Sequence, residues 1–158
     1  MRLDNSQESL KQVANGRILG VDYGRKRIGL AISDPFQMLA STFKTVSNAK
    51  LGKTVREIAA LIAELSVSAI VLGQPLHMSG EKSDMAKEID AFVTELETQI
   101  DLPIFLWDER WTTQSAEKLM IETGRSPSKS RQHIDQVAAA FLLQSFLDRL
   151  SFLKKTLN

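Results

Sequence analysis

Residues 18–34 read ILGVDYGRKRIGLAISD, two apolar runs joined by a short turn rich in glycine and basic residues. Apolar runs of this length with β-branched residues are typical of buried strands, so we expect strands at 17–22 and 27–33. The connection at 24–27 is tight enough for a hairpin, which predicts an antiparallel pair. A weaker apolar run at 38–46 predicts a third strand of the same group.

Beyond residue 50 the apolar spacing becomes helical, with apolar residues three or four positions apart. Two fully apolar runs interrupt this pattern and predict central parallel strands that are covered on both faces. The expected strands are 69–73 and 102–107, and the expected helices are about 51–65, 85–100, 113–123 and 133–150. Loops are expected at 74–82 and in the Ser- and Arg-rich stretch 125–132.

This order of elements predicts one α/β domain with a mixed five-stranded sheet flanked by helices. The first three strands are expected to be antiparallel and the last two parallel. Residues 1–16 are mostly polar and are predicted to be a flexible extension, with one helical turn around 8–13. The domain proper is expected to span 17–150, and 151–158 is expected to be a C-terminal tail.

Composition excludes several classes of site and leaves others open. With no cysteine in 158 residues, disulfides, thiolate zinc sites and a cysteine nucleophile are excluded. With only two histidines, a multi-histidine metal site is excluded too. The net charge of +1 argues neither for nor against nucleic acid. No stretch reaches the ~20 apolar residues that cross a bilayer, and the polar N-terminus predicts no export signal.

Three widely separated acidic residues fall where strand-to-helix connections meet one edge of the sheet. Asp22 ends the first strand, Glu109 follows the strand at 102–107, and Asp135 is expected in the first turn of the last helix. Active sites of open α/β sheets gather at the carboxyl ends of the strands. Converging carboxylates bind hard divalent cations, and pairs of such cations cleave phosphodiesters. The pattern therefore indicates a nuclease.

Each acid also has a purely structural explanation. Asp22 could close a turn, Glu109 could pair with Arg110 or cap the next helix, and Asp135 could interact with the helix dipole. The sequence leaves open whether Asp108 or Glu109 faces the site. Small residues after Asp135 favour a close approach of that helix to the sheet, and three acids at compatible positions favour a shared site.

Cationic residues flank each acid and are candidates to hold phosphates beside the metals. Ordinary solvated loop charge is the alternative explanation for any one of them. The candidates are Arg25, Lys26, Arg110, Arg125, Lys129 and Arg131.

Four motifs, in the right order, resemble the YqgF/RuvX family: ILGVDYGRKRIGLAISD (18–34), LGQPLHMSG (72–80), DERWTT (108–113) and IDQVAA (134–139). The resemblance implies an RNase H-like fold shared with Holliday junction resolvases. It also implies a cytoplasmic nuclease that matures the 5′ end of precursor 16S rRNA, with Asp22, Glu109 and Asp135 as its acids. The chain departs from the family at the 16 residues that precede the first strand and at Trp111, where an aliphatic residue is commoner.

The resulting hypothesis is a hydrolase with two Mg²⁺ or Mn²⁺ ions, in which Asp22 bridges the ions and Glu109 and Asp135 each complete one side. Its expected partners are structured precursor rRNA, branched DNA and ribosomal particles, and no membrane. Two alternatives stay open: a Holliday junction resolvase, and an rRNA-binding assembly factor without catalysis. An ATPase of the actin/hexokinase type is a third, suggested by Asp22-Tyr23-Gly24 with Gly29, but it would need a second such domain.

Overall fold

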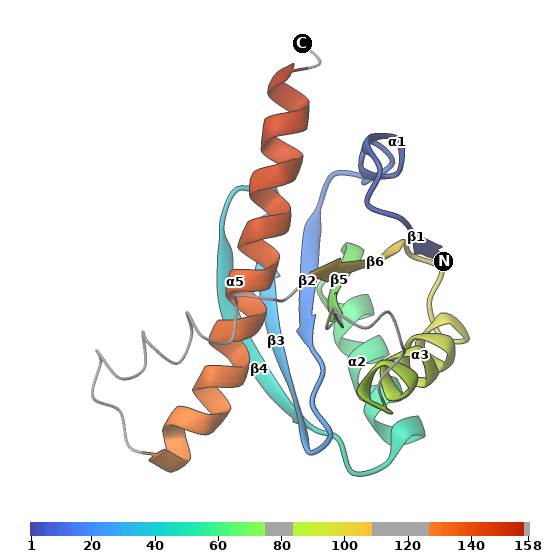
Figure 1. Cartoon of the computed structure of the whole chain (residues 1–158), viewed down its shortest axis with the longest axis vertical. Coiled ribbons are helices and arrows are strands. Elements are labelled where there is room, and N and C mark those ends of the chain that lie inside the picture. Colours follow the sequence, from blue (N-terminus) through green and yellow to red (C-terminus); the bar gives the residue numbers. More distant parts are fainter. Residues whose placement is uncertain (75–83, 109–126, 157–158) are drawn as a thin grey trace.

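The computed structural model describes residues 1–74, 84–108 and 127–156, in which six strands form one sheet in the order β1-β6-β5-β2-β3-β4. The strands are β1 Arg2–Leu3, β2 Arg17–Asp22, β3 Arg27–Ser33, β4 Ala40–Ser47, β5 Val67–Gln74 and β6 Ile104–Asp108. The helices are α1 Gln7–Leu10, α2 Leu51–Glu64, α3 Asp84–Glu97 and α5 Pro127–Thr156. Helices α2 and α3 cover one face of the sheet, and the long helix α5 runs along the other (Figure 1).

The strand directions confirm the prediction from the sequence. Strand β2 pairs antiparallel with β3, and β3 pairs antiparallel with β4. Strand β5 is parallel to both β2 and β6. Because β5 lies between parallel neighbours and under helices on both faces, its side chains from Ala69 to Gly73 are all buried.

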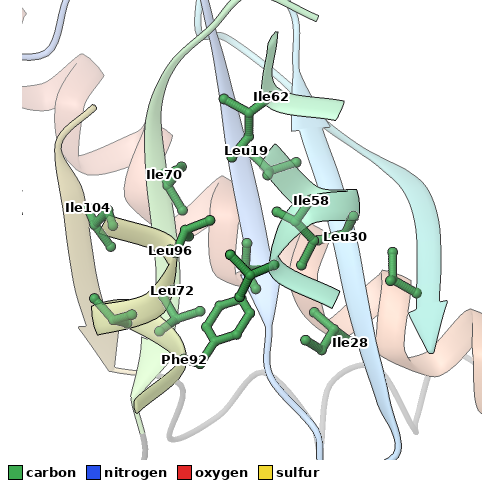
Figure 2. Close-up of a cluster of buried hydrophobic side chains, with 14 of the residues drawn as sticks. Leu19, Ile28, Leu30, Ile58, Ile62, Ile70, Leu72, Phe92, Leu96 and Ile104 are labelled. Carbon is green, nitrogen blue, oxygen red and sulfur yellow. The ribbon is translucent and has the colours of Figure 1, made fainter. Parts of the chain in front are cut away.

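Alternate residues of the central strands supply two separate cores. Leu19 and Val21 of β2 face α2 and α3, whereas Ile18 faces α5. Figure 2 shows the first core, in which Phe92 and Leu96 of α3 and residues of α2 meet the strand side chains. Fully burying one such side chain contributes about 1.5–3 kcal/mol. The sheet is therefore fixed from both faces, which makes its edges rigid supports for a site.

The N-terminal residues differ from the predicted flexible extension. Arg2 pairs with Ile104, so β1 adds a sixth strand, parallel to β6. Ser6 caps α1 by accepting a hydrogen bond from the backbone N–H of Ser9, and Leu10 is buried in the α5 core. Helix α1 overlaps the helical turn predicted around 8–13, whereas a two-residue strand is too short to leave a periodic pattern in the sequence.

Helix α5 also differs from its predicted bounds of 133–150, because it begins at Pro127 and ends at Thr156. The stretch 127–132 is therefore helical rather than a loop, and most of the expected tail continues the helix. Proline is favourable at the first helical position, where its missing N–H costs nothing. Asp135 consequently lies more than two turns inside the helix, so the prediction that it lies in the first turn was wrong, and the alternative that it interacts with the helix dipole loses its basis.

Three predicted elements lie wholly or partly outside the described residues: the loop at 74–82, the helix at 113–123 and the first part of the stretch 125–132. Among the described helices none is both long and apolar enough to span a bilayer.

Candidate active site

Asp22 lies at the carboxyl end of the central strand β2, on the face that α5 covers. Val21 faces the α2–α3 core, whereas Gly20 faces α5, where an added Cβ would come within 2.9 Å of Leu143 Cβ. Because side chains alternate along a strand, Asp22 shares the α5 face with Gly20. The residue is half-buried, so its carboxylate is placed at the sheet edge by a rigid strand.

Asp135 reaches the same place because α5 rests directly on a glycine. Gly29 of β3 is the register partner of Asp22. A Cβ built on Gly29 would lie 2.0 Å from the Asp135 carbonyl oxygen and 2.9 Å from Asp135 Cβ, far inside contact distance. Directly paired Cα atoms of antiparallel strands are only about 4.5–5.5 Å apart. Asp22 is thus paired with the glycine on which Asp135 rests, and the two acids are neighbours.

An ion pair with Arg27 holds the Asp135 side chain in position. Its Nε donates a hydrogen bond to Asp135 Oδ2 at 2.9 Å, and the two side chains are 37% and 24% exposed. Arg27 lies two residues before Gly29 and therefore on the same face of β3. The ion pair places a cation beside two adjacent carboxylates, which offsets part of their repulsion. From the sequence, Arg27 is one of the cations that follow Asp22 and could hold phosphates, but its ion pair with Asp135 was not predicted.

A second contact fixes α5 against the edge of the sheet. Gln136 Nε2 donates to Thr45 Oγ1 of β4 at 3.0 Å. Together with the Arg27 ion pair it holds successive residues of the helix, so the direction of the Asp135 side chain is set from two strands.

The strand that precedes the third predicted acid ends at the same edge. Strands β2, β5 and β6 are parallel, and Val21, Leu72 and Leu106 form one row across them. With neighbouring strands about 4.8 Å apart, β6 lies roughly 10 Å from β2. Glu109 itself lies outside the described residues. Within the described ranges no group of three or more acidic or histidine side chains could hold a metal, so these ranges bring together two of the predicted acids.

Of the predicted phosphate ligands, Arg25 and Lys26 lie in the turn that follows Asp22. Asn48 holds this turn, donating from its backbone N–H to the Lys26 carbonyl at 2.9 Å and from Nδ2 to the Gly24 carbonyl at 2.8 Å. Arg25 Nε donates to Glu88 of α3 at 3.0 Å, and both side chains are largely exposed. Arg25 thus points toward α3 over a hollow of about 330 Å³, while Lys26 is exposed to solvent.

The remaining predicted cations are not tested. Arg110 and Arg125 lie outside the described residues. Lys129 and Arg131 belong to the first turns of α5 rather than to a loop, and their side chains lie outside the described part.

Comparison with known proteins assigns the chain to a family. The sequence model of the RuvX family, described as Holliday junction resolvase, matches residues 16–149. The chain belongs to the RuvX family. It is 44% identical to a protein of Roseiflexus sp. over 84% of this chain and 94% of the relative, and 39% identical to one of Desulforamulus reducens over 84% and 96%. Both RuvX relatives carry the provisional name pre-16S rRNA nuclease.

Solved structures agree on the fold. RuvC of Thermus thermophilus, solved in complex with a Holliday junction substrate, matches with a TM-score of 0.58 at 13% identity, over 86% of this chain and 96% of that chain. The RuvX chain therefore has the RNase H-like fold of RuvC-type nucleases, as expected. Names of relatives and fold together support an enzyme that hydrolyses nucleic acid.

Proposed function

We propose that this RuvX protein is a divalent-metal-dependent nuclease that trims the 5′ end of precursor 16S rRNA. The observation that carries the proposal is the seat of Asp135 on Gly29, directly beside Asp22. The rRNA substrate is supported by the names of the relatives. A cytoplasmic location and an encounter with ribosomal particles follow from that substrate and belong to the proposal.

The donor set fits Mg²⁺ or Mn²⁺, which prefer carboxylate oxygens over nitrogen or sulfur. We propose that Asp22, Glu109 and Asp135 hold the ions. When bound, a pair of such ions would activate water and stabilise the charge on the leaving oxygen. Asp22 would be the central ligand of the three, because β2 lies between β3, on which Asp135 rests, and the strands that lead to Glu109.

Between the two neighbouring acids we propose Glu109 rather than Asp108. Trp107 lies on the α5 face, where its Nε1 donates to Ser145 Oγ at 3.2 Å and its ring meets Phe146 edge-on. Strand positions two apart share a face, so this parity favours position 109 on the side of Asp22 and Asp135. Loss of cleavage in Glu109→Gln, with cleavage kept in Asp108→Asn, would support the choice.

The chain's own residues would orient the reaction. Asp22 and Asp135 are held by a strand and a helix of the rigid core, which is the precision a site of this kind needs. Arg27 keeps Asp135 turned toward the sheet edge. Lys26, exposed in the turn after Asp22, would contact a phosphate beside the scissile bond, and Arg25 would do so by leaving Glu88 of α3.

The test uses a precursor RNA that spans the 5′ end of 16S rRNA, incubated with Mg²⁺ or Mn²⁺. We expect cleavage that is lost on chelation and in Asp22→Asn, and kept in the matched control Glu57→Gln, an exposed acid of α2. RNA that binds the wild-type protein but stays intact would support the assembly factor instead.

A second candidate is hydrolysis of branched DNA, favoured by the family description and by the likeness to RuvC. Four-way DNA junctions offered beside the precursor RNA, under the same metal conditions, separate the two. Preferential cutting of the junction, again lost in Asp22→Asn, would replace the rRNA proposal and leave the site unchanged.

A further inference from the structure

The connection between β3 and β4, residues 34–39, presents unusually exposed apolar side chains. We call it the Phe36 loop. Phe36 is 82% exposed, Leu39 68% and Met38 62%, the highest values among the large apolar side chains of the described part of the chain. Contiguous exposed apolar groups on a soluble domain mark interaction surfaces more often than scattered single residues do.

The loop is held rigidly from within. The Asp34 carboxylate accepts three backbone N–H bonds, from Phe36 at 3.0 Å, Met38 at 2.8 Å and Leu39 at 2.7 Å. These bonds lower the pKa of Asp34 below its usual value, the contribution from Leu39 being the largest. Gln37 adopts a left-handed backbone with φ of 60°, a conformation that non-glycine residues rarely take.

Neighbouring segments hold the loop from outside. The Gln37 side chain is buried and donates to the carbonyls of Ala14 and Gly16, while its oxygen accepts from Lys154 of α5. Gln144 of α5 donates to the Met38 carbonyl at 3.1 Å. The polar groups of the Phe36 loop thus hold it against the rest of the protein, and its apolar side chains point outward into solvent. Such preorganisation reduces the entropy cost of ordering the loop when a partner docks.

The surroundings of the loop are apolar with a cationic rim. A hollow of about 160 Å³ lies between Phe36, Met38 and Leu150 and is edged by Lys154 and Lys155. An adjoining hollow of about 120 Å³ shares Leu150 and Lys154 and is edged by Lys11. Among the described residues no carboxylate lines either hollow, and the carboxylate of the nearby Asp34 accepts hydrogen bonds from the backbone of its own loop.

We propose that the Phe36 loop and the last turns of α5 dock a protein partner that presents apolar side chains flanked by carboxylates. Its apolar groups would cover Phe36, Met38 and Leu39 and enter the two hollows, and its carboxylates would meet the lysines. Met38 and Leu39 have no ring on which a base could stack, which favours protein over single-stranded RNA. The surface lies at the opposite end of the sheet from the β2–β3 turn, so a docked partner leaves the candidate active site open (Figure 1).

The proposal can be tested by NMR titration of the full chain with a synthetic amphipathic peptide that carries Leu and Phe on one face and Glu on the other. We expect the Glu peptide to shift the amide signals of residues 34–40 and 150–155. Binding should weaken about tenfold or more in Phe36→Ser/Met38→Ser, equivalent to ~1.4 kcal/mol. Lys11→Glu/Lys155→Glu should weaken it as well.

Two variants separate docking from misfolding. Phe141→Ser removes an apolar side chain of α5 that is 39% exposed and lies outside the loop, and it should bind the peptide normally. Asp34→Ala keeps every exposed apolar group but releases the loop, so it should weaken binding through lost preorganisation. Unchanged melting of Phe36→Ser/Met38→Ser would show that its fold is intact.

Several outcomes would overturn the proposal. If a peptide of the same pattern with Lys in place of Glu binds as tightly, the proposed role of the lysines is wrong. If Phe36→Ser/Met38→Ser binds the Glu peptide as tightly as the wild type, the Phe36 loop is not the binding surface. A single-stranded RNA or anionic phosphatidylserine vesicles that shift the same signals more tightly would assign the surface to another ligand. A dimer in sedimentation that Phe36→Ser/Met38→Ser abolishes would assign it to a second copy.

Discussion

Gly29→Ala is the substitution to which this protein should be most sensitive, because it acts on the fold and the candidate site together. The added Cβ would lie 2.0 Å from the carbonyl oxygen and 2.3 Å from the carbonyl carbon of Asp135. Ordinary contact begins at 3.4 Å, so the helix backbone must retreat by about 1.4 Å. Both obstructing atoms are backbone, and no side-chain rotation relieves the clash.

The retreat disturbs a core that is buried along most of α5. Overpacking of this kind costs about 1–3 kcal/mol. In a chain of this size each kcal/mol lowers the melting temperature by roughly 2–4 °C, so we expect a loss of several degrees. Displacing a catalytic group by an ångström can reduce the rate by about 10²-fold, so the proposed cleavage should fall by a similar factor.

The assay is thermal unfolding in the absence of metal, followed by cleavage of the precursor RNA under single-turnover conditions. Gly52→Ala is the matched control, since its added Cβ would meet only the flexible end of Arg56 at 3.3 Å. Gly52 lies in the first turn of α2, so the change should leave the stability unchanged or raise it slightly. A Gly29→Ala protein that melts like the wild type would refute the contact between α5 and β3 as the element that seats Asp135.

The other predictions concern single side chains. Mg²⁺ at 100 times its Kd should raise the melting temperature by roughly 5–10 °C, and Asp22→Asn should abolish the rise; the same rise in the variant would count against the site. Arg27→Gln should cost no more than about 1 kcal/mol in urea unfolding, because the ion pair is partly exposed, yet reduce cleavage strongly; unchanged cleavage would show that Asp135 needs no partner. The Asp34 pKa lies below its usual 3.8 because of hydrogen bonds from Leu39, Met38 and Phe36, so its contribution to stability is present above pH 3.8 and lost as the pH falls through the folded-state pKa. The melting temperature of Asp34→Asn should therefore lie below that of the wild type at pH 6, and the difference should shrink as the pH falls below 3.8. A difference that stays the same at both pH values would exclude this role for Asp34.

Much of the sheet was predictable from residues 17–107, because its strands are apolar runs bounded by turns or by helical spacing. The bounds Arg17–Asp22 and Arg27–Ser33 were predicted correctly, since each apolar run begins after an arginine and is closed by an aspartate, Asp22 or Asp34. Strand β1 was not predictable, because its two residues are ordered by contacts remote in sequence: Arg2 Nε donates to Glu97 at 3.0 Å and the terminal amine to the Leu102 carbonyl at 3.1 Å. Such contacts leave no local pattern.

The proximity of Asp22 and Asp135 was predictable only in part. Small residues near Asp135 indicated that the helix approaches the sheet closely. The residue spacing does not show that the helix packs on β3, or that Gly29 is the residue it contacts. The start of α5 was missed because residues 127–132 are polar and lack a periodic apolar stripe, although Pro127 is a frequent first residue of a helix. The ion pair of Arg27 with Asp135 was not predicted, because a charged residue at a strand end is usually explained by exposure to solvent.

The position of α5 follows from two strand glycines, and this links stability to the candidate chemistry. Glycine within a strand normally weakens the sheet, so its presence needs a compensating contact. At Gly20 that contact is the backbone of Ala139 and the side chain of Leu143, and at Gly29 it is the backbone of Asp135. Two such contacts on adjacent strands fix both the height and the rotation of the helix. The packing that buries Leu143 therefore also places Asp135 over Gly29, the register partner of Asp22, and substitutions at Gly29 should lose stability and cleavage together. Substitution of Asp22, which lies beyond the core at the strand end, should lose cleavage alone, and this difference separates a helix that merely packs on the sheet from one that positions an acid.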